Sequence, residues 1–316
     1  MGDIAAGSGR VALVAGATRG AGRGIALELA RAGFLVYATG RSSRSAGPSE
    51  IGRPETIEET ADLIAALGGA GVARVVDHED PAAVTALVTE VERSQGRLDV
   101  LVNDIFGGDR YSEWEKPQWE HDWARGLRIL QMGVHTHLIT ARVALPLLLR
   151  TAAASGGRGL LIEVTDGTAA ANAEFRRNVG FYYDLVKANV ERIVKGLAAE
   201  LADRDLPVTA VGVTPGWLRS EKMLENFGVT ERTWRDALTR VPGFGISESP
   251  AYIGRGVAAL ALDHEAARWA GTIVSARQLA DAYGFTDADG SRPDCWGYLA
   301  EYGWDQDDGE GVDRFR

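Results

Sequence analysis

The amino-acid sequence predicts an α/β protein with a doubly wound, seven-stranded parallel sheet and helices on both faces. Two observations lead to this class: short apolar runs alternate with helical patterns, and the first run ends in a glycine-rich turn that opens into a helix. No repeat or long linker divides the chain, so we expect a single domain over residues 1–316, with an aromatic-rich extension over residues 281–316. The expected strands are Val11–Ala15, Leu35–Thr39, Val72–Val76, Leu98–Asn103, Gly159–Thr165, Val208–Val213 and Thr272–Ser275.

The first strand, turn and helix have the residue types of a phosphate-binding unit. Glycines at 16, 20 and 22 let the backbone turn tightly and approach a diphosphate, while the helix N-terminus supplies N–H donors. Apolar residues between Ile25 and Phe34 fit a helix packed back on the strand. The residues expected to contact a cofactor from this turn are Gly16, Thr18, Arg19, Gly20, Ala21 and Gly22.

Composition narrows the class of protein. The chain has 34 basic and 44 acidic residues, a net charge of −10, which argues against nucleic acid or an anionic membrane as a partner. The single cysteine, Cys295, excludes an internal disulfide and a multi-cysteine metal site, so we expect no metal and a reducing, cytoplasmic location. No export signal is found, and the most apolar helix, Val134–Leu149, is interrupted by charged and polar residues, so no membrane span is expected.

The end of the second strand indicates which dinucleotide binds. A site selective for NAD would place a carboxylate here to hold the ribose 2′-hydroxyl. The sequence instead has Gly40 and Arg41, and a guanidinium can bind a 2′-phosphate. Arg19, inside the glycine turn, can reach the same phosphate. Together the two arginines favour NADP(H) over NAD.

A tyrosine and a lysine lie four residues apart on a predicted helix after the fifth strand. Tyr183 and Lys187 therefore share one helix face. A tyrosine with its ordinary pKa of about 10 is a poor acid or base at neutral pH, but a nearby ammonium lowers that pKa. The pair is a candidate acid–base centre, and this spacing selects Tyr183 rather than Tyr182, which we expect to pack.

Four motifs occur in the order seen in the short-chain dehydrogenase/reductase family, which the chain resembles over about residues 9–280. The tail after residue 258 more loosely resembles the branch that contains mammalian dehydrogenase/reductase family member one. The resemblance implies a single-domain Rossmann fold that binds NAD(P)(H) and moves hydride between nicotinamide and a carbonyl or alcohol carbon. The motifs are Gly16-x-x-x-Gly20-x-Gly22, Asn103, Tyr183-x-x-x-Lys187 and Pro215-Gly216.

The same resemblance implies roles for further residues. Asp77, with His78 beside it, would contact adenine, and Asn103 would border the adenosine ribose. Lys187 would also hold the nicotinamide ribose. The segment that would close over the nicotinamide amide consists of Pro215, Gly216, Trp217 and Leu218.

The sequence departs from the family at the catalytic serine. Asp166 stands at that position, and the segment from there to Tyr183 is a few residues longer than usual. An ionised carboxylate cannot donate a hydrogen bond to a substrate oxygen, although a protonated one can. We therefore prefer Thr165 or Thr168 as the hydroxyl donor and keep a protonated Asp166 as the alternative.

Two further departures lie nearby. Gly133 stands where the family usually has an asparagine that supports a water relay to the lysine, so the relay must differ. Residues 104–106 are Asp-Ile-Phe in place of Asn-Ala-Gly, which predicts a bulkier floor or a narrower pocket. His135 and His137 point to different sides of their helix, so a joint metal site is not expected.

Aromatic residues are concentrated in loops that the fold would place around the nicotinamide. Such area suits a flat, largely apolar substrate, although any single ring can equally pack a loop onto the sheet. The rings of the tail could cover a neighbouring subunit's site or seal an edge, and we interpret Asp287–Gly290 as a turn and not a calcium loop. The rings are Trp114, Trp119, Trp123, Phe181, Trp217, Phe227 and Trp234, with Trp296, Tyr298, Tyr302 and Trp304 in the tail.

The leading hypothesis is an NADP(H)-dependent carbonyl reductase or alcohol dehydrogenase, with Tyr183 as acid or base and Lys187 tuning it. Asp166 and Gly133 keep open a non-redox enzyme on the same fold, for dehydration, cyclisation or isomerisation. A non-catalytic NADP-sensing protein is the third hypothesis. By family resemblance we also expect a homodimer or homotetramer, since helices 135–149 and 183–201 pair across a two-fold axis in that family and are apolar here on more than one face.

Overall fold

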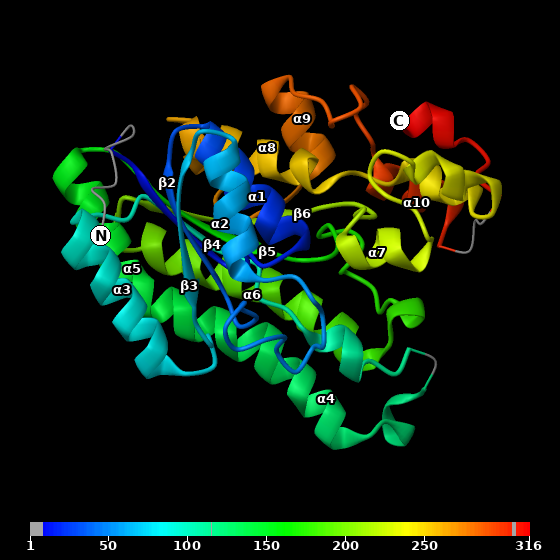
Figure 1. Ribbon diagram of the computed structural model, residues 1–316, viewed down its shortest axis with the longest axis horizontal. Coiled ribbons are helices and arrows are strands. Elements are labelled where there is room, and N and C mark those ends of the chain that lie inside the picture. Colours follow the sequence, from blue (N-terminus) through cyan, green and yellow to red (C-terminus); the bar gives the residue numbers. More distant parts are fainter. Residues whose placement is uncertain (1–8, 115, 305–307) are drawn as a thin grey trace.

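The computed structural model describes residues 9–114, 116–304 and 308–316. These residues form a seven-stranded, all-parallel sheet in the order β3-β2-β1-β4-β5-β6-β7 (Figure 1). The predicted fold class is confirmed, with strand ends shifted by one or two residues. The strands are β1 Val11–Ala15, β2 Leu35–Gly40, β3 Ala70–Val75, β4 Val100–Asn103, β5 Gly159–Val164, β6 Val208–Thr214 and β7 Ile273–Ser275.

The central strand β1 separates two hydrophobic cores because successive side chains point to opposite faces. Ala12 and Val14 face one core, and Val11 and Leu13 face the other. Helices α1, α2, α8 and α9 cover the first face, and α3, α5 and α6 cover the second (Figure 1). Their bounds are α1 Gly20–Arg31, α2 Ile57–Ala66, α3 Pro81–Gln95, α5 Thr136–Ser155, α6 Phe181–Ala202, α8 Pro250–Leu262 and α9 Ala276–Tyr283.

Helices α1 and α8 pack unusually closely. A Cβ atom added at Gly24 of α1 would lie 2.1 Å from the carbonyl oxygen of Pro250, so only glycine permits this approach. The contact fixes the glycine-rich turn at the start of α1 against the C-terminal part of the domain.

One long helical run carries the second face. Helix α4 (Trp123–Leu130) continues through a π-helical segment, Gln131–His135, into α5. The run is long and apolar enough, by length and composition, to cross a membrane, which the sequence analysis did not expect. In this structure Ala144, Leu147 and Leu148 of α5 pack against the sheet, as in the core helix of a globular domain.

The aromatic-rich extension returns to the carboxyl ends of the strands. Helix α10 (Cys295–Tyr302) packs its buried Cys295 and Tyr298 against Trp217, which follows β6. The buried pair Arg219–Asp287, with 3.1 Å between its charged atoms, ties the extension to the same loop. Asp287 to Gly290 is a turn, closed by a hydrogen bond from the Gly290 N–H to the Asp287 carbonyl, as interpreted from the sequence.

Candidate active site

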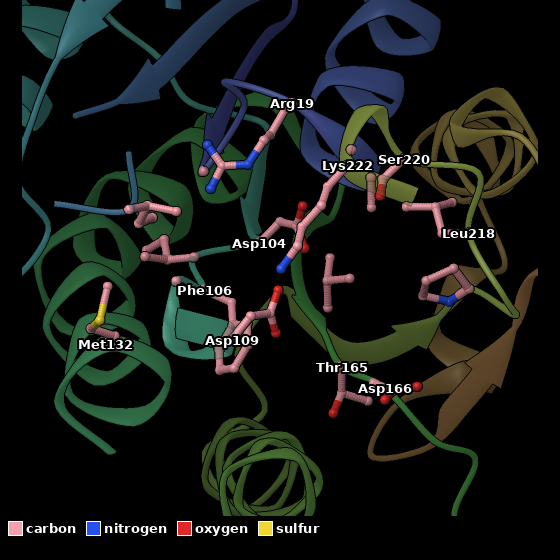
Figure 2. Close-up of a pocket in the computed structure, with 18 of the residues that line it drawn as sticks. Arg19, Asp104, Phe106, Asp109, Met132, Thr165, Asp166, Leu218, Ser220 and Lys222 are labelled. Atoms are coloured by element: carbon pink, nitrogen blue, oxygen red, sulfur yellow. The ribbon is translucent and has the colours of Figure 1, made fainter. Parts of the chain in front are cut away.

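A cavity of about 770 Å³ opens at the carboxyl ends of β1, β2, β4, β5 and β6 (Figure 2). Its walls come from the glycine-rich turn, the loops after β2 and β4, the start of α6, the loop after β6 and helix α10. The predicted residues that line it are Gly16, Thr18, Arg19, Gly20, Ala21, Arg41, Asp77, His78, Thr165, Asp166, Tyr183, Lys187, Pro215, Gly216, Trp217 and Leu218. Gly22, Asn103 and Thr168 do not line it.

Two glycines of the glycine-rich turn, Gly16 and Gly22, leave no room for a side chain. Gly16 has a φ of +88°, and a Cβ atom there would lie 2.1 Å from the Asp104 carbonyl oxygen. A Cβ atom at Gly22 would lie 2.4 Å from the Gly16 carbonyl oxygen. The turn therefore holds the N-terminus of α1 at the mouth of the cavity, where backbone N–H groups can bind an anion.

Two carboxylates already occupy donors at this helix end. The Gly20 N–H donates to Glu221 Oε2 at 2.8 Å, and Glu221 also pairs with Arg23 at 3.2 Å. Glu221 begins helix α7 (Glu221–Asn226), which lies in the loop after β6. Asp104 accepts the Gly22 N–H, and burial raises the pKa of its carboxyl to about 6. Glu221 could not be found from a local pattern, since it is 201 residues from Gly20.

The two arginines predicted to read the cofactor differ in their surroundings. Arg19 lines the cavity, and among the described residues no carboxylate pairs with it; burial lowers its pKa. Arg41 pairs with Glu50 at 2.9 Å and Glu79 at 3.4 Å, with Asp77 at 3.9 Å. A phosphate at Arg41 would therefore compete with neighbouring carboxylates.

His78 lies behind this end of the cavity as a neutral structural link. Its ring nitrogens bond the hydroxyls of Thr39 and Thr140, each at 2.8 Å. Burial lowers its pKa to about 3. Asp77, beside it, is exposed at the rim.

Tyr183 is bonded to Asp166. The Tyr183 hydroxyl donates to Asp166 Oδ2 at 2.9 Å. The ring contacts Phe106 edge-on, with 5.4 Å between centroids, and lies 5.3 Å from Trp114. Burial, and then the charge of Asp166, raise the pKa of Tyr183 well above its ordinary value, opposite to the lowering by Lys187 expected from the sequence. Tyr182 instead packs in a separate cluster with Ile129, as expected.

Lys187 lies one turn further along α6. Its Nζ is 3.9 Å from the centroid of the Phe106 ring and 5.3 Å from that of Tyr183. Burial lowers the pKa of its amine. The lysine and the tyrosine thus meet at one end of the cavity.

The two threonine hydroxyls are used by the backbone. Thr165 donates to the Lys187 carbonyl at 2.9 Å, and Thr168 accepts the Ala171 N–H at 3.2 Å. The carboxylate of Asp166 is the group that reaches Tyr183. Asp166, and neither threonine preferred from the sequence, therefore contacts the Tyr183 hydroxyl, and it does so as an acceptor and not as a donor.

The sequence analysis missed Arg176, which comes from the lengthened segment before Tyr183. It is buried, with Nη1 3.5 Å from Asp166 Oδ2 and Nε 3.2 Å from Asp184 Oδ1. Asp184 also accepts the Arg176 N–H at 3.2 Å. The extra residues therefore bring a cation behind Asp166, held by a carboxylate of its own.

A buried polar network forms the floor. Asn103 Nδ2 donates to Glu163 Oε1 at 2.9 Å, and the other Glu163 oxygen bonds His137 Nδ1 at 2.5 Å. His137 Nε2 bonds the Ile105 carbonyl at 3.0 Å. Asn103 lies under the site as part of this network. His135, in contrast, is exposed.

Gly133 lies in the π-helical segment. A Cβ atom there would lie 2.5 Å from Val186 Cγ1 and 3.1 Å from the Phe106 ring. The space that a larger residue would need is filled by Phe106 and Val186. The two sequence departures, at Gly133 and at Phe106, therefore depend on each other.

The predicted aromatic residues divide between the cavity and elsewhere. Trp114, Trp217, Trp296 and Trp304 line the cavity, and Trp296 Nε1 donates to the Pro215 carbonyl at 2.9 Å. Trp119 and Trp123 are exposed, so they do not face it. The others pack away from it: Phe181, Phe227, Trp234, Tyr298 and Tyr302.

Charged lining residues were also missed. Asp109 and Lys222 point into the cavity, as does Asp104 (Figure 2). Asp109 follows β4 and Lys222 lies in α7, and neither segment carries a sequence motif.

Residues 10–230 match the family model described as short chain dehydrogenase, and the chain belongs to the short-chain dehydrogenase/reductase family. The chain is thus a member of an oxidoreductase family that uses nicotinamide cofactors. It is 33% identical to mouse (Mus musculus) dehydrogenase/reductase SDR family member 1 over 291 residues, covering 89% of this chain and 84% of the mouse protein. The human (Homo sapiens) protein of the same name is 30% identical over 291 residues, covering 90% and 84%. The loose resemblance to that branch is confirmed. The solved Pseudomonas aeruginosa RhlG/NADP active-site complex has a TM-score of 0.66 at 22% identity, covering 84% of this chain and 94% of that one.

Proposed function

We propose that this protein is an NADP(H)-dependent oxidoreductase that transfers hydride between the nicotinamide and a carbonyl or alcohol carbon of a small, largely apolar or aromatic substrate. The observation that carries the proposal is the meeting of Tyr183 and Lys187 at one end of a cavity whose other end is a glycine-rich helix N-terminus. A nicotinamide cofactor supplies or accepts the hydride when bound.

The residues present fit such a cofactor. Gly16 and Gly22 allow the tight turn, because a Cβ atom at either position would clash with a backbone oxygen, and the turn places backbone N–H groups where a diphosphate would bind. Arg19 and Arg41 would hold the 2′-phosphate of NADP, and Pro215 to Leu218 would cover the nicotinamide amide. Lys187 would hold the nicotinamide ribose.

Tyr183 is the proposed proton donor. Its raised pKa keeps the phenol protonated at neutral pH, and a protonated phenol serves as an acid rather than a base. The site is therefore suited to reduction more than to alcohol oxidation. Asp166 orients the hydroxyl, and Arg176 stabilises the Asp166 carboxylate.

The walls support the substrate class. Trp114, Trp217, Trp296 and Trp304 give flat apolar surfaces, while the charged groups lie at the two ends. We infer that an aromatic or alicyclic ring lies between these walls with its reacting carbon toward Tyr183.

We also propose a single domain over residues 1–316 that works in the cytoplasm as a homodimer or homotetramer. The exposed side chains of Leu138 on α5 and Leu185 on α6 would lie in the interface. Leu147 on α5 and Val190 on α6 are buried inside the protein, so they cannot serve there.

The test is consumption of NADPH by the purified protein with a panel of ketones, quinones and aldehydes. Tyr183→Phe should lower kcat by about 10²–10⁴-fold, since it removes the proton donor. If no panel member is reduced, or if product forms without a change in nicotinamide absorbance, hydride transfer is not the function.

A further inference from the structure

Asp166 offers the cavity a hydrogen-bond acceptor where ketone reduction needs a second donor. Its Oδ2 accepts the Tyr183 hydroxyl and faces Arg176. Among the described residues no donor bonds its other oxygen, Oδ1. The side chain is 32% exposed and lines the cavity, so Oδ1 is open to a substrate.

No hydroxyl replaces the missing donor. The Thr165 hydroxyl donates to the Lys187 carbonyl. The Thr168 hydroxyl accepts the Ala171 N–H and does not line the cavity. Tyr183 is the first donor, and its hydroxyl would have to leave Asp166 to reach a ketone oxygen. A ketone oxygen placed here would meet a carboxylate and no second O–H donor from these residues.

The charge that develops during reduction decides which substrate suits this arrangement. When hydride adds to a ketone, negative charge grows on the oxygen, and a neighbouring carboxylate repels it. When hydride adds to a protonated C=N group, positive charge disappears instead. Before the reaction, the N–H of that group can donate to Asp166 Oδ1 in a charge-assisted hydrogen bond.

The surroundings of Asp166 also suit a cation. Arg176 also pairs with Asp184, with 3.2 Å between the charged atoms. The single positive charge of Arg176 is therefore shared between two carboxylates and does not fully neutralise Asp166. Asp104 and Asp109 add carboxyl groups that line the same cavity, together with the amines of Lys187 and Lys222. Four tryptophans and Phe106 form walls, and aromatic faces attract cations.

We propose that the preferred electrophile of this cavity is a flat, cyclic, protonated imine, bound through its N–H to Asp166 Oδ1, over a ketone of the same shape. The inference rests on the proposed hydride transfer. A C–H bond forms at the imine carbon, the C=N π pair becomes the nitrogen lone pair, and a neutral secondary amine leaves. The reduced nicotinamide is oxidised by two electrons. No proton is drawn from Tyr183, which stays on Asp166 and positions it.

The test compares 3,4-dihydroisoquinoline with 1-tetralone, two bicyclic probes of similar shape, using NADPH and the full chain near neutral pH. The kcat/KM for the imine should exceed that for the ketone by about tenfold or more, as expected when one substrate leaves a buried polar group unpaired. N-methyl-3,4-dihydroisoquinolinium, a cation without an N–H, should fall between them.

Variants separate charge from shape. Asp166→Asn keeps the size of the side chain and removes its charge, and Asp166→Ser supplies a hydroxyl donor; both should move the preference toward 1-tetralone by about tenfold. Asp203→Asn removes an exposed carboxylate that does not line the cavity and should change the ratio by less than about threefold. Circular dichroism checks that each variant is folded.

The outcomes are distinct. Faster reduction of 1-tetralone by the unmodified protein, or a ratio unchanged by both Asp166 variants, overturns the imine proposal while hydride transfer stands. If neither probe nor the carbonyl panel consumes NADPH, the proposed function fails, and the imine proposal fails with it.

Discussion

The two ends of the cavity hold their carboxylates in different ways. At the cofactor end, Glu221 binds the Gly20 N–H, and Glu50 and Glu79 bind Arg41; these donors are the ones a phosphate would use. At the catalytic end, Asp166 binds Tyr183 and is backed by a buried arginine. We infer that the first set is displaced when the cofactor binds, while Asp166 stays and sets the chemistry.

This difference shows that residue type alone does not define a carboxylate's role. A partly exposed carboxylate on a backbone N–H can be exchanged for another anion at small cost, because water compensates it. A carboxylate held against a buried cation is costly to remove, because the cation would lose its partner.

The largest effect is expected at Glu163, a carboxylate in the buried network under the site. Glu163→Ala leaves Asn103 and His137 without their buried partner and should lower the free energy of unfolding by about 3–5 kcal/mol. Urea unfolding followed by circular dichroism measures it, and the exposed Glu174→Ala is the matched control. A loss below about 1 kcal/mol would show that the floor does not depend on this network.

The next effect concerns the cofactor end. Arg19→Ala removes a cation that pairs with no carboxylate among the described residues. It should raise the KM for NADPH by about 10–100-fold and leave that for NADH within about threefold, since only NADPH has the 2′-phosphate. Steady-state kinetics with both cofactors measure it. Arg232→Ala, at an exposed arginine, is the control. Equal effects on the two cofactors would contradict the role of Arg19 at the 2′-phosphate.

At the catalytic end, the Asp166→Asn substitution should change the pH dependence of kcat. The charge of Asp166 helps to raise the pKa of Tyr183, so Asp166→Asn should lower that pKa. The phenolate then forms at lower pH, and the rising limb of the pH profile for alcohol oxidation should move to lower pH. The measurement is kcat against pH with NADP⁺ and an alcohol that the protein oxidises. A limb that moves to higher pH, or not at all, would show that Asp166 does not control Tyr183.

The smallest effect should come from Glu221. Glu221→Gln removes the charge that lies on the Gly20 N–H, so a diphosphate meets less competition and the Kd for NADPH should fall by about two- to fivefold. Fluorescence titration of NADPH measures it. Glu174→Gln, at an exposed carboxylate that does not line the cavity, should leave the Kd unchanged. Weaker binding in the Glu221 variant would mean that this carboxylate supports the cofactor site.

Much of the cofactor end could be predicted from the sequence. The strands, the glycine-rich turn and the Tyr183–Lys187 spacing are local patterns, because side-chain period and glycine's freedom at positive φ act over a few residues. They were enough for the confirmed fold class and family. The choice between Thr165 and Asp166 could not be made from local sequence. It depended on the hydrogen bond by which the Thr165 hydroxyl donates to the Lys187 carbonyl of α6.

The sequence by itself therefore determined the sheet, the turn and the pair of residues on α6. Only the tertiary structure decided what surrounds them: Arg176 behind Asp166, Glu221 on the Gly20 N–H, and Trp296 on the Pro215 carbonyl. These contacts join segments 10, 201 and 81 residues apart, and they form because packing of the sheet and its helices brings the strand ends together. No periodic pattern in the sequence encodes contacts between such distant segments. The chemistry of the site therefore becomes visible only in the folded chain.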